Sequence, residues 1–475
     1  MTAQDVAGRV GGGPDPYEPR SALPWVRDQD LFLLTDRYEL TMLQAYWAEE
    51  MHARAVFSLF VRRLPEHRNF LLACGLDTAL ALLERLRPSQ EALAHLLEEG
   101  FAPGFVEWLA GFRFTGDVWA VPEGTPLFPN EPILEVEAPL PEAQVVESLL
   151  MNQVHLQTVL ASKAVRVKLA AGERAVADFG LRRMHGADAA LKAARAFHVA
   201  GVDATSNVLA GKVYGVPVTG TMAHSYVQAH DDELGAFRAF AREFPDTVLL
   251  VDTYDTLHGV RNVVRLAEEL GPAFRVRGVR LDSGDLGALA VEARRVLDDA
   301  GLGEVEIFAS GGLDEWEIRR LVDSGAPIDG FGVGTRMGVA TDAPALDIVY
   351  KLTAYDGRGR LKLSSGKHTL PGRKQVFRME SGGVAEQDVL ARADERLDGR
   401  PLLRKVMEEG VRLAAGAEDL ERIRARTRVE IERLPVSLRG LDRADPPYPV
   451  HLSERMSRYH EEVMHEMGQG PEVPA

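Results

Sequence analysis

The chain has 475 residues, of which 27% are charged and 45% are hydrophobic, and its formal net charge at pH 7 is -16. A chain of this length can form two or three domains with substantial cores. The acidic balance argues against a nucleic-acid-binding protein, which needs a basic surface, but it leaves room for small anionic ligands held by a few local groups. No uninterrupted apolar stretch is long enough to cross a bilayer, so no membrane partner is expected.

The N-terminal segment and the cysteine content predict where the protein resides. Residues 1–24 lack a basic start followed by an apolar run, so they are not a signal peptide, and their glycines and prolines predict a disordered leader. Cys74 is the only cysteine, which rules out an internal disulfide and favours a reducing cytoplasm. Because Cys74 follows two leucines and an alanine, we expect it in the core.

Residues 25–140 are expected to form an N-terminal α+β domain. The stretch "TDRYELTMLQAYW" predicts a helix capped by Thr35 or Asp36. "AVFSLFVRRLP" alternates as a strand, and "GLDTALALLERLRP" predicts a helix that ends at a proline. Short strands separated by proline and glycine turns are expected from Gly116 to Pro139. A long helix is expected over Pro141 to Ala171.

Residues 141–349 contain a recurrent unit, in which an apolar run ends in polar or glycine residues and most of the intervals contain a helical pattern. The seven runs are "AVADFG", "VDATSN", "VTGTMAHS", "VLLVDTYDT", "GVRLDSGDL", "IFASGGL" and "GFGVGT". Seven such units favour a (β/α) barrel, although the sequence does not exclude an open parallel sheet. In such barrels the chemistry lies at the C-terminal ends of the strands, where the polar residues fall.

Residues 350–475 change in character. They begin with alternating strand patterns and continue into a charged helical region, "EDLERIRARTRVEIERL". We expect this part to pack on the N-terminal domain. The predicted fold is therefore α/β, an irregular (β/α) barrel of parallel strands plus a mixed α+β domain formed by the N-terminal and C-terminal segments.

The run "DFGLRRMHG" places Phe179, Arg182 and Arg183 at a predicted strand end. An aromatic face beside guanidinium groups suits a flat anionic ring, because one group stacks while the others neutralise charge. The alternative is a core phenylalanine with surface arginines.

The run "GVRLDSGDL" places Arg280, Asp282 and Ser283 at another strand end. Strand alternation puts Arg280 and Asp282 on the same side. The arginine could hold a carboxylate, and the aspartate could bind sugar hydroxyls or help to hold Mg²⁺. The alternative is that Asp282 or Ser283 caps the next helix, which leaves the inward arginine unexplained.

Two glycine-rich turns follow the last two strands, Gly311–Gly312 in "ASGGLDE" and Gly332 to Gly334 in "GFGVGT". Glycine lets backbone N–H groups approach a phosphate, and a barrel's phosphate site is commonly formed by its final two loops. Either turn alone is weak evidence, since turns use glycine in any case.

His224, in "GTMAHSYVQAH", is expected where a buried strand ends and a helix begins. The residues alone leave three alternatives open: a core histidine, a ligand or a nucleophile.

Two other motifs do not meet the spacing that their functions require. His460 and His465 in "HEEVMHEM" are five residues apart, whereas a zinc-protease helix needs a separation of four. "SSGKHT" lacks the earlier glycine of a P-loop, and no cluster of Cys and His is evident.

Together these stretches resemble the nicotinate phosphoribosyltransferase family, within the type II phosphoribosyltransferases. The likeness runs in order through "LLTDRYELTM", "PEGTPLFPNEPILEV", "DFGLRR", "GVDATSNVLAG", "GTMAHS", "LLVDTYDT", "GVRLDSGDL", "GFGVGT" and "TLPGRKQVFR". The resemblance implies transfer of a phosphoribosyl group from 5-phosphoribosyl 1-diphosphate (PRPP) to nicotinate, with ATP as co-substrate and Mg²⁺ as cofactor.

The resemblance also implies roles by position. Tyr38 would stack on the pyridine ring from a second subunit, opposite Phe179, in a homodimer with active sites at the interface. Arg280 would bind the carboxylate, and Asp282 would bind ribose and support Mg²⁺. The remaining positions implied to bind substrate or phosphate are Arg182, Arg183, Asp203, Ser206, Asn207, Thr221, Ser283, Gly311, Gly312, Gly332, Gly334 and Thr335.

By the same resemblance His224 would be phosphorylated by ATP, and no carboxylate that orients it can be identified from the sequence. The nearest alternative is a nicotinamide phosphoribosyltransferase, and a quinolinate enzyme is more distant because it needs no phosphorylated histidine. A phosphosugar isomerase or aldolase would need a lysine or carboxylate base at a strand end, and the sequence shows no convincing one. A degenerate barrel serving as a scaffold would have lost some of the pocket residues, and no such loss is apparent.

Overall fold

The computed structural model describes residues 26–363 and 369–468. The predicted leader, residues 1–24, and most of "SSGKHT" lie outside the described residues. The chain divides into two compact units, Met1–Leu34 with Arg85–Arg113, and Thr35–Glu84 with Phe114–Ala475. The smaller unit contains the short helices η1 (Asp28–Leu33), α4 (Gln90–Glu98) and α5 (Pro103–Leu109). The predicted domain limits at residues 140 and 349 stay a prediction.

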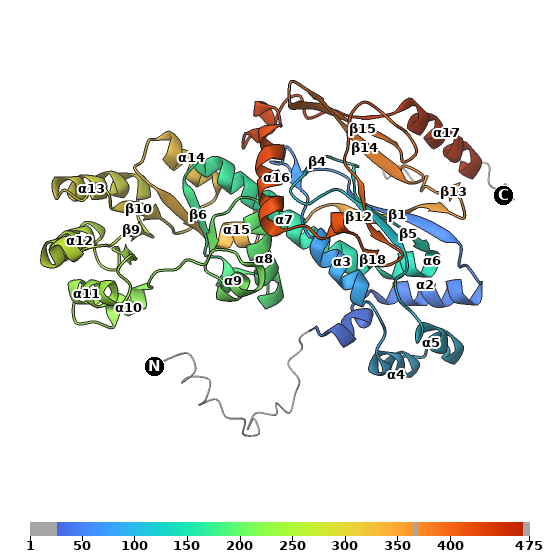
Figure 1. Cartoon of the computed structure of the whole chain (residues 1–475), viewed down its shortest axis with the longest axis horizontal. Helices are drawn as coiled ribbons and strands as arrows, with labels where there is room; N and C mark the ends of the chain where they lie inside the picture. The colour runs from blue at the N-terminus through green and yellow to red at the C-terminus, as the bar shows by residue number, and fades with distance from the viewer. Residues whose placement is uncertain (1–25, 364–368, 469–475) are drawn as a thin grey trace, which may run out of the picture. The chain divides into compact units, whose positions relative to one another are not determined.

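The larger unit contains a seven-stranded sheet that joins segments from both ends of the chain (Figure 1). Its strand order is β13 (Arg358–Gly359), β12 (Ile348–Tyr355), β1 (Arg54–Val61), β5 (Pro132–Pro139), β3 (Asp117–Ala120), β17 (Arg404–Glu408) and β18 (Val411–Arg412). In the central antiparallel register, Leu59 lies opposite Leu134 on one side and Tyr350 on the other. This sheet confirms the predicted mixed α+β domain of N- and C-terminal segments.

β1 departs from the expected half-buried strand. Seven of its eight residues, from Ala55 to Val61, are buried, so both faces of the strand are covered. The phenyl ring of Phe57 stacks on Tyr350, with 4.8 Å between ring centroids, and the Tyr350 hydroxyl donates a 2.7 Å hydrogen bond to the Ala143 carbonyl. The helix α6 (Leu140–Val145) therefore covers one face of the sheet at this point.

Two smaller sheets complete this region. One has the order β16 (Arg400–Pro401), β14 (Lys374–Ser381), β15 (Val384–Arg392) and β19 (Val450–Leu452), and the other pairs β2 (Leu71–Leu72) with β4 (Pro126–Leu127). The charged region predicted near the C-terminus forms α16 (Leu420–Glu432), and α17 (Glu454–Gly468) packs on β15.

The recurrent unit forms a curled parallel sheet, a half-barrel. Its order is β7 (Ala204–Thr205), β6 (Ala175–Asp178), β11 (Gly330–Val333), β10 (Glu306–Ala309), β9 (Gly278–Leu281) and β8 (Val248–Leu250). Beyond β7, Val218 adds one parallel bridge to Thr205. This is the strand order of a barrel opened between Val218 and β8, because no ladder joins these two segments among the described residues.

The strand predicted in "VTGTMAHS" is therefore wrong except for that single bridge. The apolar run before it belongs largely to the helix α9 (Val208–Tyr214). Asn207 caps this helix, and Gly215, at φ +72°, ends it in the left-handed conformation that glycine favours. These capping signals thus fix a helix before the predicted strand, and they leave the pairing of the residues from Val216 onward to tertiary contacts.

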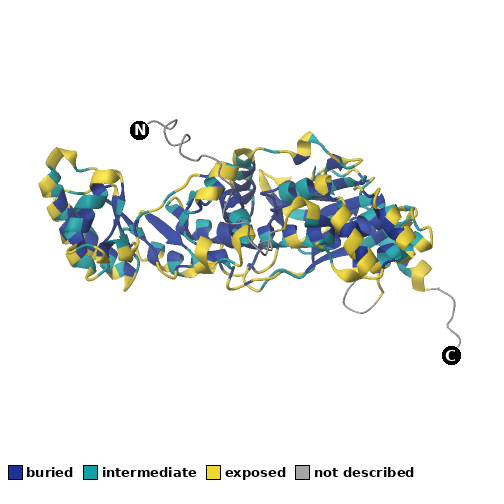
Figure 2. Ribbon diagram, turned by 90° about the horizontal axis from the view of Figure 1, so that it is seen from below, coloured by how far each residue is buried: buried dark blue, intermediate teal, exposed yellow. Residues whose placement is uncertain are grey.

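Most of the predicted helices are present. Among them are α2 (Arg37–Ala48), α3 (Leu76–Arg85), α7 (Glu147–Ala171) and α10 (His224–Gln228). The intervals between the apolar runs contain α8 (Ala187–Val199), α11 (Glu233–Glu243), α12 (Thr256–Leu270) and α13 (Leu286–Asp299), and α14 (Glu315–Asp323) and α15 (Thr335–Gly338) follow the two glycine-rich turns. The long helix predicted from Pro141 is divided at Val146 into α6 and α7. α7 is buried along most of its length. α12 and α13 belong to the group of helices at the left of the view, which expose their outer faces (Figure 2). No described helix is both long and apolar enough to span a membrane.

The half-barrel depends on close packing between a strand end and the helix that follows it. A Cβ atom built on Gly259, in α12, would lie 2.0 Å from the carbonyl oxygen of Val251. We expect Gly259→Ala to lower the free energy of unfolding by about 1–3 kcal/mol, because backbone must move. Gly287, in the first turn of α13, is the control: its Cβ would meet only the side-chain ends of Leu321 and Asp285, at 3.4 Å and 3.6 Å. Gly287→Ala should be neutral or stabilising by up to about 1 kcal/mol. Urea unfolding midpoints measure both, and equal midpoints would contradict the packing argument.

Candidate active site

A cavity of about 330 Å³ lies inside the half-barrel. Its lining includes Phe179 after β6, Arg280 on β9, Phe308 on β10 and Gly332 on β11. These strands are neighbours in the parallel sheet, so their carboxyl ends meet at one edge. Polar groups at that edge are where α/β sheets commonly bind ligands.

Phe179 and Arg280 form one wall of this cavity. The guanidinium carbon of Arg280 lies 5.6 Å from the centroid of the Phe179 ring. A Cβ atom on Gly332 would lie 2.4 Å from that ring, so the absence of a side chain at Gly332 leaves room for Phe179. Gly332 therefore has a packing role in addition to any role in the turn that follows it.

Only part of the hydrogen-bonding capacity of the Arg280 side chain is used within the described residues. Its NH2 group donates a 2.9 Å hydrogen bond to the Met222 carbonyl, but its Nε–H is buried and has no partner among the described residues. Burial lowers the pKa of Arg280, and Asp282 and Asp252 oppose that shift. A buried, unpaired donor beside an aromatic ring is what a planar carboxylate would satisfy.

Asp282 and Ser283 do not cap the following helix. The N-cap of α13 is Asp285, whose carboxylate accepts a 3.2 Å hydrogen bond from the Ala288 N–H. Asp282 instead accepts a short hydrogen bond from the Ser310 hydroxyl at the end of β10. The capping alternative is thereby excluded, and the Asp282 carboxylate is free to face the site.

A further carboxylate, Asp252, stands behind Asp282 at the end of β8. Its Oδ2 accepts hydrogen bonds from the Asp282 N–H, at 3.0 Å, and from the Ser283 hydroxyl, at 2.6 Å. Its Oδ1 is buried and has no hydrogen-bond partner in the described part of the chain. The two carboxylates form an acidic pair with unused oxygen acceptors.

His224 is the first residue of α10. Its Nδ1 lies 3.2 Å from the Thr253 hydroxyl, and its Nε2 lies 4.0 Å from Asp282 Oδ2. The side chain is 41% exposed, which rules out a buried core histidine. The Thr253 hydroxyl orients the ring through Nδ1, while Nε2, 4.0 Å from Asp282, makes no hydrogen bond to that carboxylate and stays accessible to a reactant.

The two glycine loops lie beside each other at the ends of β10 and β11. Gly311, at φ +96°, passes so close to Asp282 that a Cβ would lie 1.9 Å from its carbonyl oxygen. Gly312 is exposed at φ +68°, and Gly334 is the N-cap of α15, followed by exposed Thr335. Such turns present backbone N–H groups to an anion.

Other residues singled out from the sequence have structural partners. The Asp203 carboxylate accepts hydrogen bonds from Lys168 at 3.0 Å, Arg424 at 2.9 Å and the Val176 N–H at 2.9 Å. Asn207 caps α9 through a 3.2 Å hydrogen bond from the Ala210 N–H. The Ser206 N–H donates to the Asp178 carbonyl, at 2.8 Å. Asp203 and Thr221 also line the cavity.

Arg182 and Arg183 are exposed in the short helix η2 (Leu181–Arg183), next to the cavity wall. Tyr38, in contrast, is not among the cavity residues. It lies near the start of α2, is 47% exposed and hydrogen-bonds to Glu147, and burial together with this carboxylate raises its pKa. Within one chain Tyr38 and Phe179 are thus not brought together.

The sequence reasoning missed four polar residues that shape this edge: Asp178, Asp252, Thr253 and Ser310. Asp178 is buried, which raises its pKa, and it accepts hydrogen bonds from the Gly180 N–H at 2.7 Å and the Thr205 hydroxyl at 2.8 Å. Each of the four ends or follows a strand of the half-barrel, which is the signal that could have found them. Across residues 26–363 and 369–468, no three His, Cys, Asp or Glu side chains form a metal-binding group.

Comparisons with known proteins agree with this geometry. Residues 33–155 match the family model of the nicotinate phosphoribosyltransferase (NAPRTase) N-terminal domain, and residues 174–372 match that of the NAPRTase family. The chain is 55% identical over 425 residues to "Nicotinate phosphoribosyltransferase pncB2" of Mycobacterium tuberculosis. This match covers 89% of this chain and 92% of the relative. It is 44% identical over 389 residues to "Nicotinate phosphoribosyltransferase" of Bacillus subtilis, with 80% and 79% covered. The crystal structure of human nicotinic acid phosphoribosyltransferase superposes with a TM-score of 0.80 at 31% identity, covering 90% of this chain and 99% of that one.

The contacts of Asp203 predict a structural effect. Asp203→Asn weakens its hydrogen bonds to Lys168 and Arg424, so we expect the free energy of unfolding to fall by about 1–3 kcal/mol while the KM values per folded molecule stay unchanged. The control is Asp188→Asn, which removes an exposed i,i+4 pair with Lys192 and should cost less than about 0.5 kcal/mol. Urea unfolding and steady-state kinetics measure both variants. A raised KM in Asp203→Asn without loss of stability would assign Asp203 to substrate binding instead.

Proposed function

The chain belongs to the nicotinate phosphoribosyltransferase family, and from that premise we propose how its residues divide the reaction. The enzyme transfers a phosphoribosyl group from PRPP to nicotinate, giving nicotinate mononucleotide and pyrophosphate, a step of NAD biosynthesis. The observation that carries the assignment of residues is the buried, unpaired Nε–H of Arg280 beside the Phe179 ring.

Nicotinate would lie with its ring against Phe179 and its carboxylate against Arg280. The guanidinium would use the unpaired Nε–H for the carboxylate while NH2 keeps Met222 in place. This fixes the direction in which the pyridine nitrogen points. That nitrogen has a free lone pair at neutral pH, so no general base is needed, and catalysis reduces to alignment with the anomeric carbon and stabilisation of the leaving group.

PRPP would be held by groups around the same edge. Asp282 would accept hydrogen bonds from the ribose hydroxyls, with Ser283 beside it. Arg182 and Arg183 would face the diphosphate, and the loops containing Gly312 and Thr335 would cradle the 5′-phosphate.

The donor set also fits Mg²⁺, which proteins commonly bind through one or two carboxylates plus substrate phosphates. Asp282 is partly exposed, and Asp252 has a buried Oδ1 that finds no hydrogen-bond partner within the described residues. These two residues would hold the ion, which when bound neutralises charge on the departing pyrophosphate.

His224 would accept a phosphoryl group from ATP. The imidazole nitrogen attacks the γ-phosphorus, the bond to the β-phosphate oxygen breaks, and ADP leaves. Thr253 holds the ring, and Asp282 lies near the second nitrogen. Water later attacks the phosphorus and releases phosphate, which regenerates the histidine and couples ATP hydrolysis to nucleotide synthesis.

A second copy of the chain would complete the site, because Tyr38 is exposed and lies outside the cavity of its own chain. In a homodimer Tyr38 of each subunit would cover the nicotinate ring on the face opposite Phe179. We place the enzyme in the cytoplasm, in keeping with the single cysteine, with small molecules rather than nucleic acid or membrane as its partners.

His224→Ala should abolish stimulation by ATP and leave slow, ATP-independent turnover, because only the phosphorylated intermediate is lost. The matched control is His230→Ala, six residues further on, whose Nδ1 contacts the Tyr226 carbonyl at 2.9 Å instead of the site. Rates of nicotinate mononucleotide formation with and without ATP measure the coupling. Full ATP stimulation in His224→Ala would remove this histidine from the mechanism.

Arg280→Ala should raise the KM for nicotinate by about tenfold to a hundredfold, since a hydrogen bond to a charged group contributes about 1.5–3 kcal/mol. Arg182→Ala should instead raise chiefly the KM for PRPP.

A competition assay tests the choice of substrate. Nicotinate, nicotinamide and quinolinate are supplied together with PRPP, Mg²⁺ and ATP, and mass spectrometry identifies the products. Nicotinate mononucleotide should be the main product of the unmodified enzyme, and Arg280→Ala should show a reduced preference for nicotinate. Unchanged selectivity in Arg280→Ala would refute the carboxylate assignment.

A further inference from the structure

A buried cluster of charges lies directly behind the two glycine loops. Lys163 Nζ, on α7, contacts Glu315 Oε2 at 2.5 Å and Asp342 Oδ1 at 2.7 Å. Arg166 Nε, one turn further along α7, contacts Glu315 Oε1 at 3.0 Å, and Arg68 NH1 contacts Asp342 Oδ2 at 2.6 Å. All but Asp342 are at most 5% exposed at the side chain.

The two carboxylates belong to the two loop segments. Glu315 is the first residue of α14, three residues after Gly312, and Asp342 follows α15, which Gly334 caps. Lys163 is the one cation of this cluster that contacts both carboxylates, since Arg166 contacts only Glu315 and Arg68 only Asp342 among the described ion pairs. Its ammonium therefore links the segment after β10 to the segment after β11.

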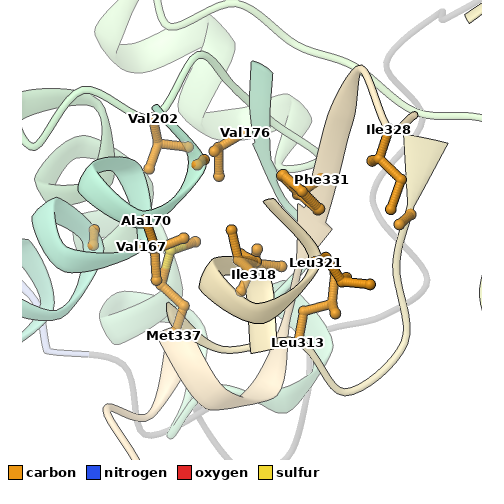
Figure 3. Packing of buried hydrophobic residues seen from close by; sticks show 14 of the residues in the cluster. Val167, Ala170, Val176, Val202, Leu313, Ile318, Leu321, Ile328, Phe331 and Met337 are labelled. Atoms are coloured by element: carbon orange, nitrogen blue, oxygen red, sulfur yellow. The ribbon is translucent and has the colours of Figure 1, made fainter. Parts of the chain in front are cut away.

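Apolar packing fixes α7 against the same two segments. Val167 and Ala170 of α7 lie against Ile318 of α14 and Met337 of α15 in the buried cluster (Figure 3). Lys163 lies one turn before Val167 on α7. The helix thus supplies a rigid support from which a single charged group reaches both loops.

We propose that Lys163 is a positioning residue that holds the two glycine loops at the spacing required for one phosphate to contact both. This rests on the proposed function, in which those loops hold the 5′-phosphate of PRPP. The ammonium group has three donors, so one lysine can contact both carboxylates, and in a buried site such contacts are strong.

The fold should tolerate loss of the Lys163 contacts with Glu315 and Asp342. Without Lys163, Glu315 keeps Arg166 and Asp342 keeps Arg68, so neither carboxylate is left without a cation. Burial alone would raise the pKa of Asp342, but Arg68 and Lys163 hold it well below its usual range. A half-exposed pair, Arg336 of α15 with Asp314 at the N-cap of α14, also joins the two segments. The specific loss without Lys163 is therefore the buried link between them.

Lys163→Met keeps an unbranched side chain one atom shorter than lysine and removes its charge. We expect its Kd for ribose 5-phosphate, measured by isothermal titration calorimetry on the full chain, to rise at least tenfold while the Kd for nicotinate changes less than twofold. The KM for PRPP should rise correspondingly. Lys163→Arg should recover part of the affinity, which a general packing defect would not allow.

Glu315→Gln separates positioning from charge. It makes the cluster more positive, so a purely electrostatic role of Lys163 predicts tighter binding of ribose 5-phosphate. Positioning predicts weaker binding, because the link to the loop after β10 is impaired. Tighter binding in Glu315→Gln would overturn the proposal.

Two further variants complete the experiment. Arg195→Met breaks another buried pair, with Glu123 at 2.7 Å, away from both loops, and should lower stability without a selective effect on ribose 5-phosphate. Thr335→Val tests the phosphate cradle itself. If the unmodified enzyme and Thr335→Val bind ribose 5-phosphate equally, the cradle is misplaced and the proposed function fails at that point. If Thr335→Val binds weakly and Lys163→Met binds normally, the cradle stands and the role of Lys163 is refuted.

Discussion

The rest of the structure depends on α7, a buried helix that places charged side chains in the core. α7 lies between the half-barrel and the antiparallel sheets and is buried over most of its 25 residues, yet it contains Lys163 and Arg166. Buried cations are costly unless they are paired and hydrogen-bonded. Glu315 and Asp342 are therefore required, and because both follow half-barrel strands, they fix where the half-barrel attaches to the helix.

Other buried pairs act in the same way between segments that are distant in sequence. Arg195 on α8 binds Glu123, and Arg378 NH1 on β14 lies 3.7 Å from Glu430 Oε2 on α16. Lys374 binds Glu135 at 2.9 Å and so connects the C-terminal sheet to β5. Such pairs add little net stability compared with apolar residues of equal size, but breaking one is expensive. Their effect is to favour one register over alternatives that would leave a charge unpaired.

The sequence predicted those features that depend on local patterns. The helices of the half-barrel follow from apolar periodicity, and the placement of Phe179, Arg280 and Asp282 at strand ends follows from polar residues at the end of apolar runs. The strand predicted around Val218 failed because only tertiary pairing decides whether the residues after α9 join the sheet, and Val218 makes a single bridge there. The run "VLLVDTYDT" places Asp252 and Thr253 at a predicted strand end, but no local pattern indicates which of its polar residues contact the site. Their contacts with Ser283 and His224 join different βα units.

The open seam of the half-barrel has a consequence for the chemistry. Residues 219–223 leave the sheet after the bridge at Val218 and carry the chain to His224 without a ladder partner among the described residues. The hydrogen bond from Arg280 to the Met222 carbonyl fastens this segment to β9. The guanidinium that we assign to the nicotinate carboxylate therefore also holds the backbone two residues before the histidine that we assign to ATP. A closed barrel would fix this segment by strand pairing, whereas here the hydrogen bond from the Thr219 N–H to the Thr205 carbonyl, the buried Met222 side chain and Arg280 hold it.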